Sequence, residues 1–224
     1  TTSLDPILED PNVVVIVEAL GGEEPAATYM KRALQAGKHV VTANKEALSK
    51  HFAELVAVAR EQQRALLFEA SVGAGIPLMA SLRQLLSVNR VERIRGIVNG
   101  TTNFILTLMA EEGVPYHDAL REAQRLGYAE PDPTADVEGL DAAYKLSILA
   151  SLAAGRHLHP DRIDRRGITS VTPDQILDAR TRGGAVKLIA EALRKDEEWE
   201  LRVHPIFVPG SDLLAHVRLN LNAI

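Results

Sequence analysis

The chain has 224 residues, a length that allows one or two domains and a sizeable buried core. Hydrophobic residues make up 46% and charged residues 25%, which is typical of a globular protein and excludes a disordered or collagen-like chain. The formal net charge of -5 argues against a nucleic-acid binder, and the absence of cysteine excludes disulfides, thiolate nucleophiles and cysteine-ligated metal sites.

The first third of the chain alternates short apolar runs with helical patterns. Val13–Val17 is a continuous β-branched run, which predicts a strand covered on both faces. His39–Ala43 and Ala65–Ala70 predict two more strands, with helices expected over Ala26–Gln35 and about Lys45–Gln63 between them. This order of strands and helices predicts a parallel sheet with right-handed crossovers.

The glycine-rich turn Ser71–Pro77 marks a change in composition, so we place a domain boundary near residue 71. The remainder predicts a second α/β domain with a mixed sheet over residues 71–224. Its expected helices are Leu78–Leu86, Asn103–Glu112, Tyr116–Leu126, Leu140–Ala154 and one from Pro173, and its expected strands are Val91–Val98, Arg162–Ile168, Val186–Ile189 and Leu201–Val208.

From the sequence we expect neither a signal peptide nor a membrane span. No apolar run approaches the ~20 residues of a membrane span, and the first residues have neither a basic start nor an apolar stretch. We therefore expect a cytoplasmic protein without a membrane or nucleic-acid partner. Because the chain starts at Thr1 and Asn220–Ile224 resembles the start of a strand, we expect an internal piece of a longer protein.

Asp141 and Lys145 form the first candidate site. Their i,i+4 spacing places them on one face of a helix, and the uncharged stretch Leu146–Ala154 predicts that this helix is buried. Desolvation lowers the pKa of a lysine toward the range useful for proton transfer, and Asp141 would oppose that shift. A structural ion pair, or a lysine that reaches solvent from the end of the helix, is the alternative.

Two further candidates are loops of the second domain. The segment Gly127–Gly139 concentrates carboxylates, and its two prolines stiffen it, which suits a substrate ammonium group but also fits a solvated connection in which Asp136 caps a helix. Asn99–Asn103 follows a strand and precedes a helix, so its backbone N–H groups could bind a carboxylate or phosphate, although a simple threonine cap is the commoner explanation of such a pattern.

The last two candidates belong to the first domain. Lys45 follows a predicted parallel strand and opens a helix, where ligands of open α/β sheets bind and where a cation is disfavoured by the helix dipole. Glu69–Ile76 could coordinate a hard cation such as sodium through carbonyls and the Glu69 carboxylate, or it could be a turn that connects the domains.

Taken together, these segments resemble the homoserine dehydrogenase family over essentially the whole chain. The matching stretches are Val13–Gly22, His39–Glu46 (HVVTANKE), Phe68–Pro77 (FEASVGAGIP), Gly96–Leu106 (GIVNGTTNFIL) and above all Ala123–Lys145 (AQRLGYAEPDPTADVEGLDAAYK). The resemblance implies that residues 1–70 are the C-terminal part of a Rossmann-type NAD(P)-binding domain and that residues 71–224 bind substrate and form a homodimer. It further implies an oxidoreductase that interconverts L-aspartate 4-semialdehyde and L-homoserine with NAD or NADP, in threonine and methionine biosynthesis.

The resemblance also implies roles for individual residues, matched motif by motif. Lys145 resembles the catalytic proton donor and acceptor, Asp141 its partner, and Lys45 the lysine near the nicotinamide and the substrate. The remaining roles are substrate binding by Glu130, Asp136, Gly100, Thr101 and Tyr128, cofactor binding by Leu20, Gly21 and Lys45, and a sodium loop formed by Glu69, Val72, Ala74 and Ile76.

The chain departs from the family pattern because it lacks the N-terminal strand–GxGxxG–helix that holds a pyrophosphate. A non-catalytic dimerisation or scaffold fragment therefore remains an alternative, as does another nicotinamide-dependent amino-acid dehydrogenase. Aspartate-semialdehyde dehydrogenase is excluded, because that enzyme needs a nucleophilic cysteine and this sequence has none.

Overall fold

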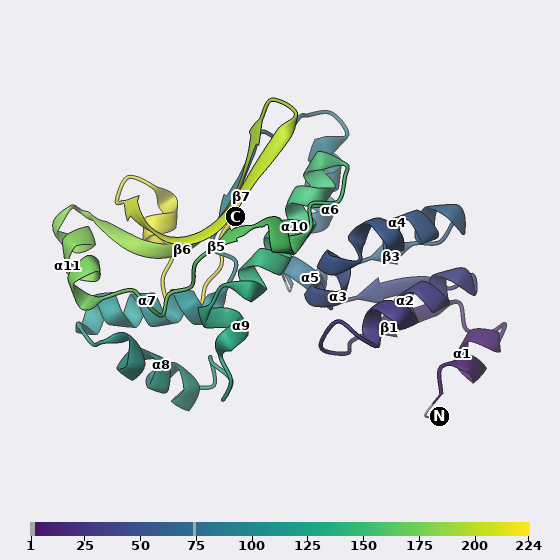
Figure 1. Cartoon of the computed structure of the whole chain (residues 1–224), viewed down its shortest axis with the longest axis horizontal. Coiled ribbons are helices and arrows are strands. Elements are labelled where there is room, and N and C mark those ends of the chain that lie inside the picture. The colour runs from purple at the N-terminus through teal and green to yellow at the C-terminus, as the bar shows by residue number, and fades with distance from the viewer. Residues whose placement is uncertain (1–2, 74) are drawn as a thin grey trace. The chain divides into compact units, whose positions relative to one another are not determined.

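The computed structural model describes residues 3–73 and 75–224, which divide into two compact units (Figure 1). Unit 1 comprises the described residues up to Arg90 together with Ser147–Pro160, and unit 2 comprises Val91–Leu146 and Asp161–Ile224. The helix α10 (Leu140–Ala154) contributes residues to both units. No helix of the described residues is long and apolar enough for a membrane crossing.

Unit 1 is built around a three-stranded parallel sheet of order β1-β2-β3. Parallel neighbours need crossover connections, and helices α2 and α4 supply them and contact each other. The elements are α1 (Asp5–Glu9), β1 (Val15–Glu18), α2 (Ala26–Gln35), β2 (His39–Thr42), α3 (Lys45–Lys50), α4 (Phe52–Glu61), β3 (Leu66–Leu67), α5 (Ala70–Gly73) and α6 (Leu78–Leu86). The predicted parallel sheet is confirmed.

Three local predictions for unit 1 are wrong. The helix expected from Lys45 to Gln63 is interrupted at His51, whose φ of -110° departs from helical geometry. The run at Val13–Val17 is not covered on both faces: Val17 is 72% exposed, because β1 is an edge strand among the described residues. The third strand ends at Leu67, and a short helix starts at Ala70 where a turn was expected.

Unit 2 holds a mixed four-stranded sheet of order β4-β6-β7-β5, as predicted for the second domain. Neighbours β4, β6 and β7 are antiparallel, whereas β5 pairs with β7 in parallel. The elements are β4 (Arg93–Gly96), α7 (Gly100–Glu112), α8 (Tyr116–Arg125), α9 (Thr134–Val137), β5 (Asp164–Arg165), α11 (Pro173–Thr181), β6 (Gly184–Lys195), β7 (Glu198–Pro209) and η2 (Leu213–His216). The short helix η1 (Pro160–Arg162) begins on the last residue of unit 1.

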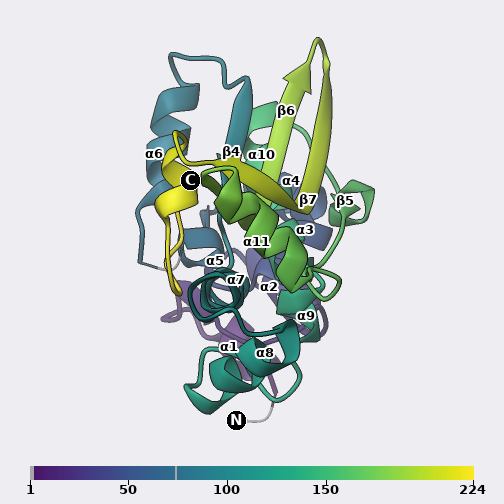
Figure 2. The ribbon, with the colours of Figure 1, turned by 90° about the vertical axis from the view of Figure 1, so that its left-hand side faces the viewer.

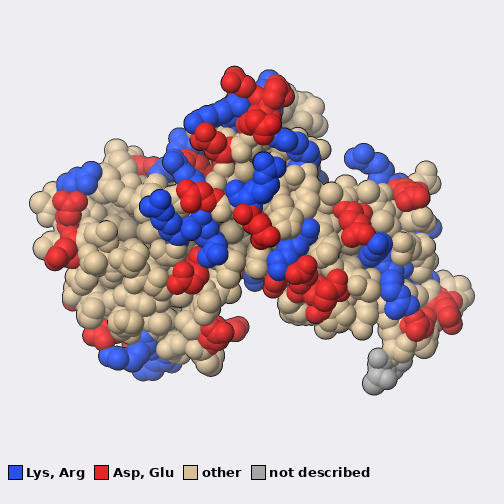
Figure 3. All heavy atoms as spheres, viewed as in Figure 1, with Lys and Arg blue, Asp and Glu red and all other residues tan. Residues whose placement is uncertain are grey.

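Strands β6 and β7 form one long hairpin, which Figure 2 shows as an extended arm. Its turn contains Asp196, which has a φ of 54°. At the other end of the hairpin, Ile189 and Val208 pack with Ile97 and are covered by Leu214, Ala215 and Val217 of the C-terminal segment. Figure 3 shows acidic and basic side chains interleaved over the visible face of the described residues.

Candidate functional site

Lys145 and Asp141 form a tight, mostly buried ion pair on α10. The Lys145 Nζ atom lies 2.7 Å from the Asp141 Oδ2 atom, and the two side chains are 15% and 7% exposed. Lys145 also donates to the carbonyl of Val98, at 2.8 Å, just beyond the end of β4. Two of the three ammonium N–H groups are therefore directed by the protein, and the third can donate to a substrate oxygen.

Asn99 joins this pair to the acidic loop. Its Nδ2 atom donates to Asp136 Oδ1 at 2.7 Å and to Asp141 Oδ2 at 2.9 Å, and the side chain is buried. Its Oδ1 atom accepts from the backbone N–H of Thr102 at 2.8 Å, so Asn99 is also the N-cap of α7. One buried amide thus fixes two carboxylates and the start of a helix. The sequence analysis offers a threonine cap as the alternative, whereas the structure makes Asn99 the cap, and nothing in the sequence identifies the contact of Asn99 with the carboxylates.

The remaining predicted substrate residues lie in the same unit. Thr101 donates from Oγ1 to the carbonyl of Tyr128 at 2.8 Å, and Gln124 donates to the carbonyl of Glu130 at 3.2 Å. These bonds tie the loop to α7 and α8. The Glu130 carboxylate is exposed and pairs with no cation among the described residues. Asp136 does not act as the helix cap that the alternative interpretation required, since its carboxylate accepts from Asn99.

Gly100 is a site of close approach between two parts of unit 2. A Cβ atom at this position would lie 2.7 Å from the backbone carbonyl oxygen of Asn220. The C-terminal segment therefore passes directly over the start of α7, held there by Asn103, whose Nδ2 donates to the carbonyls of Val217 and Leu221 at 3.2 Å. The absence of a side chain at Gly100 is required by packing, whatever the substrate.

We expect Gly100→Ala to destabilise unit 2 by about 1–3 kcal/mol, because backbone rather than a flexible side chain has to move. Urea denaturation followed by circular dichroism measures the change. Gly113→Ala is unsuitable as a control because its φ is 69°, whereas Gly75→Ala has open space around its Cβ and should cost less. Equal stabilities for the Gly100 variant and the parent chain would contradict this account.

In unit 1, hydrogen bonds converge at the carboxyl ends of β1 and β2, where open α/β sheets bind ligands. The buried Glu18 carboxylate accepts from the N–H of Leu20 at 2.7 Å and from the Thr42 hydroxyl. Asn44 donates from Nδ2 to the carbonyls of Leu20 at 3.1 Å and Gly22 at 2.8 Å. These bonds fix the backbone around Leu20 and Gly21, two residues to which the family resemblance gives a role in cofactor binding.

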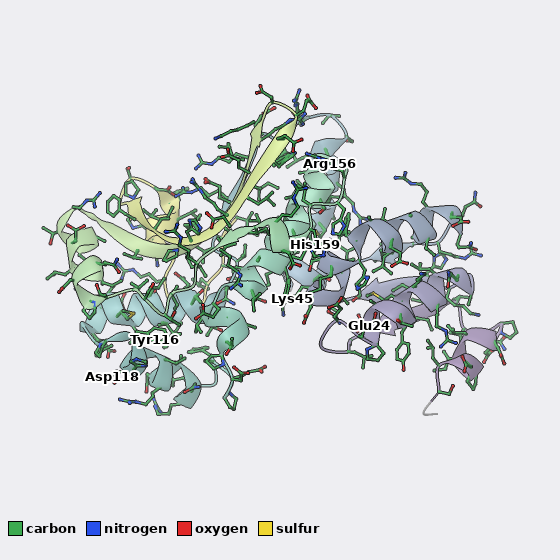
Figure 4. The ribbon with its side chains drawn as sticks, in the orientation of Figure 1. Glu24, Lys45, Tyr116, Asp118, Arg156 and His159 are labelled. Atoms are coloured by element: carbon green, nitrogen blue, oxygen red, sulfur yellow. The ribbon has the colours of Figure 1, made fainter. Side chains whose placement is uncertain are left out.

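Lys45 is the first residue of α3, directly after this network (Figure 4). Asn44 is the N-cap of that helix, since its Oδ1 atom accepts from the N–H of Ala47 at 3.0 Å. The cap of α3 and the contacts to Leu20 and Gly22 therefore depend on one side chain, that of Asn44. The position of Lys45 at a helix start agrees with the sequence interpretation, while its contact with cofactor or substrate stays a prediction.

We expect Asn44→Ala to lower the free energy of unfolding by about 2 kcal/mol, because it removes a helix cap and leaves two carbonyls without their donor. Asn44→Ser keeps the cap acceptor but loses the two carbonyl contacts, so it should recover about half of that loss. Urea denaturation of the three proteins checks the order. An alanine variant as stable as the serine variant would show that the cap contributes nothing.

The segment proposed to bind sodium lies in unit 1. The Glu69 carboxylate accepts from the backbone N–H groups of Met79 at 2.6 Å and Ala80 at 3.0 Å, at the start of α6. Val72 is buried and Ile76 is half exposed, while Ala74 lies outside the described residues. The segment is rich in oxygen acceptors, as a hard cation requires, but the contact that the structure gives Glu69 is with a helix N-terminus.

Comparisons with known proteins agree across the chain. A family model described as homoserine dehydrogenase matches residues 77–224, and one described as homoserine dehydrogenase, NAD binding domain, matches residues 1–69. The homoserine dehydrogenase of Bacillus subtilis is 43% identical over 224 residues, covering 100% of this chain and 52% of that protein. The chain thus spans about half the length of the curated relatives it matches.

Solved structures show the same likeness. A crystal structure of a homoserine dehydrogenase from Thiobacillus denitrificans matches with a TM-score of 0.95 and 43% identity, covering 99% of this chain and 52% of that one. A hyperthermophilic archaeal homoserine dehydrogenase in complex with NADPH matches with a TM-score of 0.82 and 31% identity, covering 95% of this chain and 61% of that one. The mixed α/β fold of this chain is therefore that of the proteins it matches.

Proposed function

Because this chain belongs to the homoserine dehydrogenase family, we propose that it forms the catalytic part of an enzyme that interconverts L-homoserine and L-aspartate 4-semialdehyde. In the direction of reduction, the aldehyde and NAD(P)H with one proton give the alcohol and NAD(P)+. The observation that supports this proposal best is the buried pair of Lys145 and Asp141, with one ammonium N–H left for a substrate oxygen. The pair combines a proton source with a group that orients it.

Lys145 is the proposed catalytic acid and base. When hydride reaches the aldehyde carbon, the oxygen gains negative charge and takes a proton from the Lys145 ammonium; in the oxidation of homoserine, the neutral amine takes the hydroxyl proton back. Asp141 and the Val98 carbonyl fix the direction of the amine. The carboxylates of Glu130 and Asp136 would bind the substrate ammonium, and Gly100, Thr101 and Tyr128 would line the pocket.

The cofactor position proposed for unit 1 is the edge formed by Leu20, Gly21 and Lys45. A bound nicotinamide supplies or accepts the hydride. The network of Glu18, Thr42 and Asn44 fits this role, because it presents a fixed and exposed backbone at the carboxyl ends of β1 and β2. We keep residues 1–70 as the proposed nucleotide-binding part and residues 71–224 as the part for substrate binding and dimerisation.

Two assays test the proposed function. In the first assay, NADPH is titrated into the chain and its binding is followed by fluorescence. In the second, the consumption of NADPH with aspartate semialdehyde is measured for two proteins. One is the chain, and the other is a fusion in which the unmatched parts of the Bacillus subtilis enzyme are added to the chain. Turnover by the fusion is expected. A fusion that folds and binds NADPH but does not turn over would favour the non-catalytic scaffold alternative.

We also propose that the Glu69 segment binds sodium, with Val72, Ala74 and Ile76 as the residues that contribute carbonyls. Each Glu69 oxygen accepts one N–H, so each retains a lone pair for a cation. Sodium should then raise the melting temperature of the chain relative to tetramethylammonium at equal ionic strength. Glu69→Gln should abolish the difference, and a difference that persists in the variant would contradict this assignment.

Assembly as a homodimer in the cytoplasm completes the proposal. The support is the family membership together with the cysteine-free composition, which suits a reducing compartment. Light scattering coupled to size exclusion should give about twice the chain mass of 24.4 kDa. A mass equal to one chain at the highest concentration tested would contradict the dimer.

A further inference from the structure

Unit 2 contains a cavity that shares no residue with the candidate active site. Its volume is about 300 Å³, and it lies between α7, the first residues of β6 and the segment around η2. Three cationic side chains line it, Arg180, Lys187 and Arg218, together with His216 and a single carboxylate, Glu111. With His216 neutral, the walls carry an excess of two positive charges.

Lys187 is the buried cation of this cavity. Its side chain belongs to a residue that is 3% exposed, and its Nζ atom donates to Asn103 Oδ1 at 2.9 Å and to the carbonyl of Val217. Both acceptors are neutral, and no carboxylate of the described part of the chain pairs with it. Burying a charge without a counterion is costly. Burial first, and then the charge of Arg218, lower the pKa of Lys187 to about 8, while Glu111 opposes the shift.

The two arginines reach the cavity from separate elements. Arg180 of α11 donates from Nη1 to the carbonyl of Ala110 at 2.6 Å, which holds its guanidinium beside α7. Arg218 pairs with Glu111 at 3.2 Å, so the single carboxylate is already engaged. Each guanidinium has five N–H donors, and these contacts use only one or two of them. The two guanidinium groups therefore keep N–H donors and positive charge with which they can bind a ligand.

We propose that this cavity binds a small dianion, either a phosphate group or a dicarboxylate. Two negative charges match the excess charge of the walls and provide the counterion that Lys187 lacks. Planar guanidinium groups suit both carboxylate and phosphate oxygens. The volume fits a small metabolite, because it lies at the lower end of the range for ligand pockets, and it is too small for a dinucleotide.

Isothermal titration of the intact chain tests this site without reference to the dehydrogenase reaction. Inorganic phosphate, succinate and acetate are titrated at about pH 7 and at constant ionic strength set with chloride. The proposal expects phosphate or succinate to bind, and acetate to bind at least about tenfold more weakly because it brings one charge. Which of the two dianions binds more tightly identifies the headgroup. No heat of binding for either dianion would overturn the proposal.

Substitutions locate the site. Arg218→Gln and Arg180→Gln should each weaken dianion binding about tenfold, the loss expected for one charge-assisted hydrogen bond. The matched control is Arg121→Gln, which removes an equally charged side chain that is 74% exposed on α8 and does not line the cavity. If Arg121→Gln weakens binding as much as the cavity variants do, the dianion responds only to net charge and the proposal fails.

The part played by Lys187 has its own measurement. Succinate stays doubly charged between about pH 7 and about pH 9.5, whereas Lys187 loses its proton across that range, so succinate binding to the parent chain should weaken as pH rises. Lys187→Met should bind more weakly at the lower pH and lose this pH dependence. The same pH dependence in a folded Lys187→Met variant would exclude Lys187 as a ligand contact.

Discussion

We expect Lys145→Ala to lower kcat by ~10²–10⁴-fold, the range typical of a lost general acid and base. The side chain is 15% exposed and its amine is held by Asp141 and by the Val98 carbonyl, so the substitution removes a proton donor that is fixed at one point. The rate of NADPH consumption is measured in an active enzyme that contains this segment, such as the fusion with the Bacillus subtilis parts. KM should change less than kcat, because a proton is transferred only in the transition state.

Two comparisons separate this effect from a general disturbance. Lys31→Ala removes a lysine whose side chain is 40% exposed and which pairs with Glu54 on the surface of unit 1, so kcat should stay unchanged. Lys145→Arg keeps the positive charge but cannot give up a proton near neutral pH, so it should be nearly as slow as the alanine variant. A Lys145→Ala enzyme with the parent kcat would remove Lys145 from the mechanism.

The elements that the sequence predicts best are those whose pattern is local. Helices α2, α6 and α10 have the predicted bounds, because each is an amphipathic or largely apolar stretch between clear breaks. The β6–β7 hairpin was predicted only as two shorter separate strands. Its outer residues mix charged with apolar side chains, and its turn at Asp196 lacks the glycine of the common two-residue turns.

The sheet of unit 1 shows a different limit. A β-branched run predicts a strand, but whether it is covered depends on neighbours that are distant in the chain. Val14 is 61% and Val17 is 72% exposed, because β1 pairs only with β2 among the described residues. The sequence of this run therefore predicts the strand correctly, but it does not predict how far the valine side chains are buried.

The candidate site also combines contacts that the sequence predicts with contacts that it does not. The pair of Asp141 and Lys145 is four residues apart on one helix, so its contact follows from helical geometry alone. Asn99 reaches Asp136 and Asp141 across 37 and 42 residues, and only the folded chain brings these side chains together. The cavity around Lys187 is likewise lined by residues from α7, α11, β6 and the C-terminal segment, so no single motif in the sequence predicts it.

The second large effect concerns stability rather than rate. We expect Asp141→Asn to lower the free energy of unfolding by about 2–4 kcal/mol, because it leaves the buried Lys145 ammonium without its counterion. Asn99 Nδ2 and Lys145 Nζ both donate to the same Asp141 Oδ2 atom, so an asparagine oxygen in that place keeps both acceptor contacts, and the expected loss is that of the negative charge. Urea denaturation of the chain gives this difference directly.

The double variant Asp141→Asn/Lys145→Met decides whether the missing counterion is the cause. Removing the ammonium as well takes away the unpaired charge, and methionine keeps most of the lysine stem, so part of the lost stability should return. The coupling free energy between the two positions should be about 1–3 kcal/mol. If the loss of unfolding free energy in the double variant equals the sum of the losses in the two single variants, the two charges do not stabilise each other. Asp141 would then stabilise the fold through Asn99 rather than through Lys145.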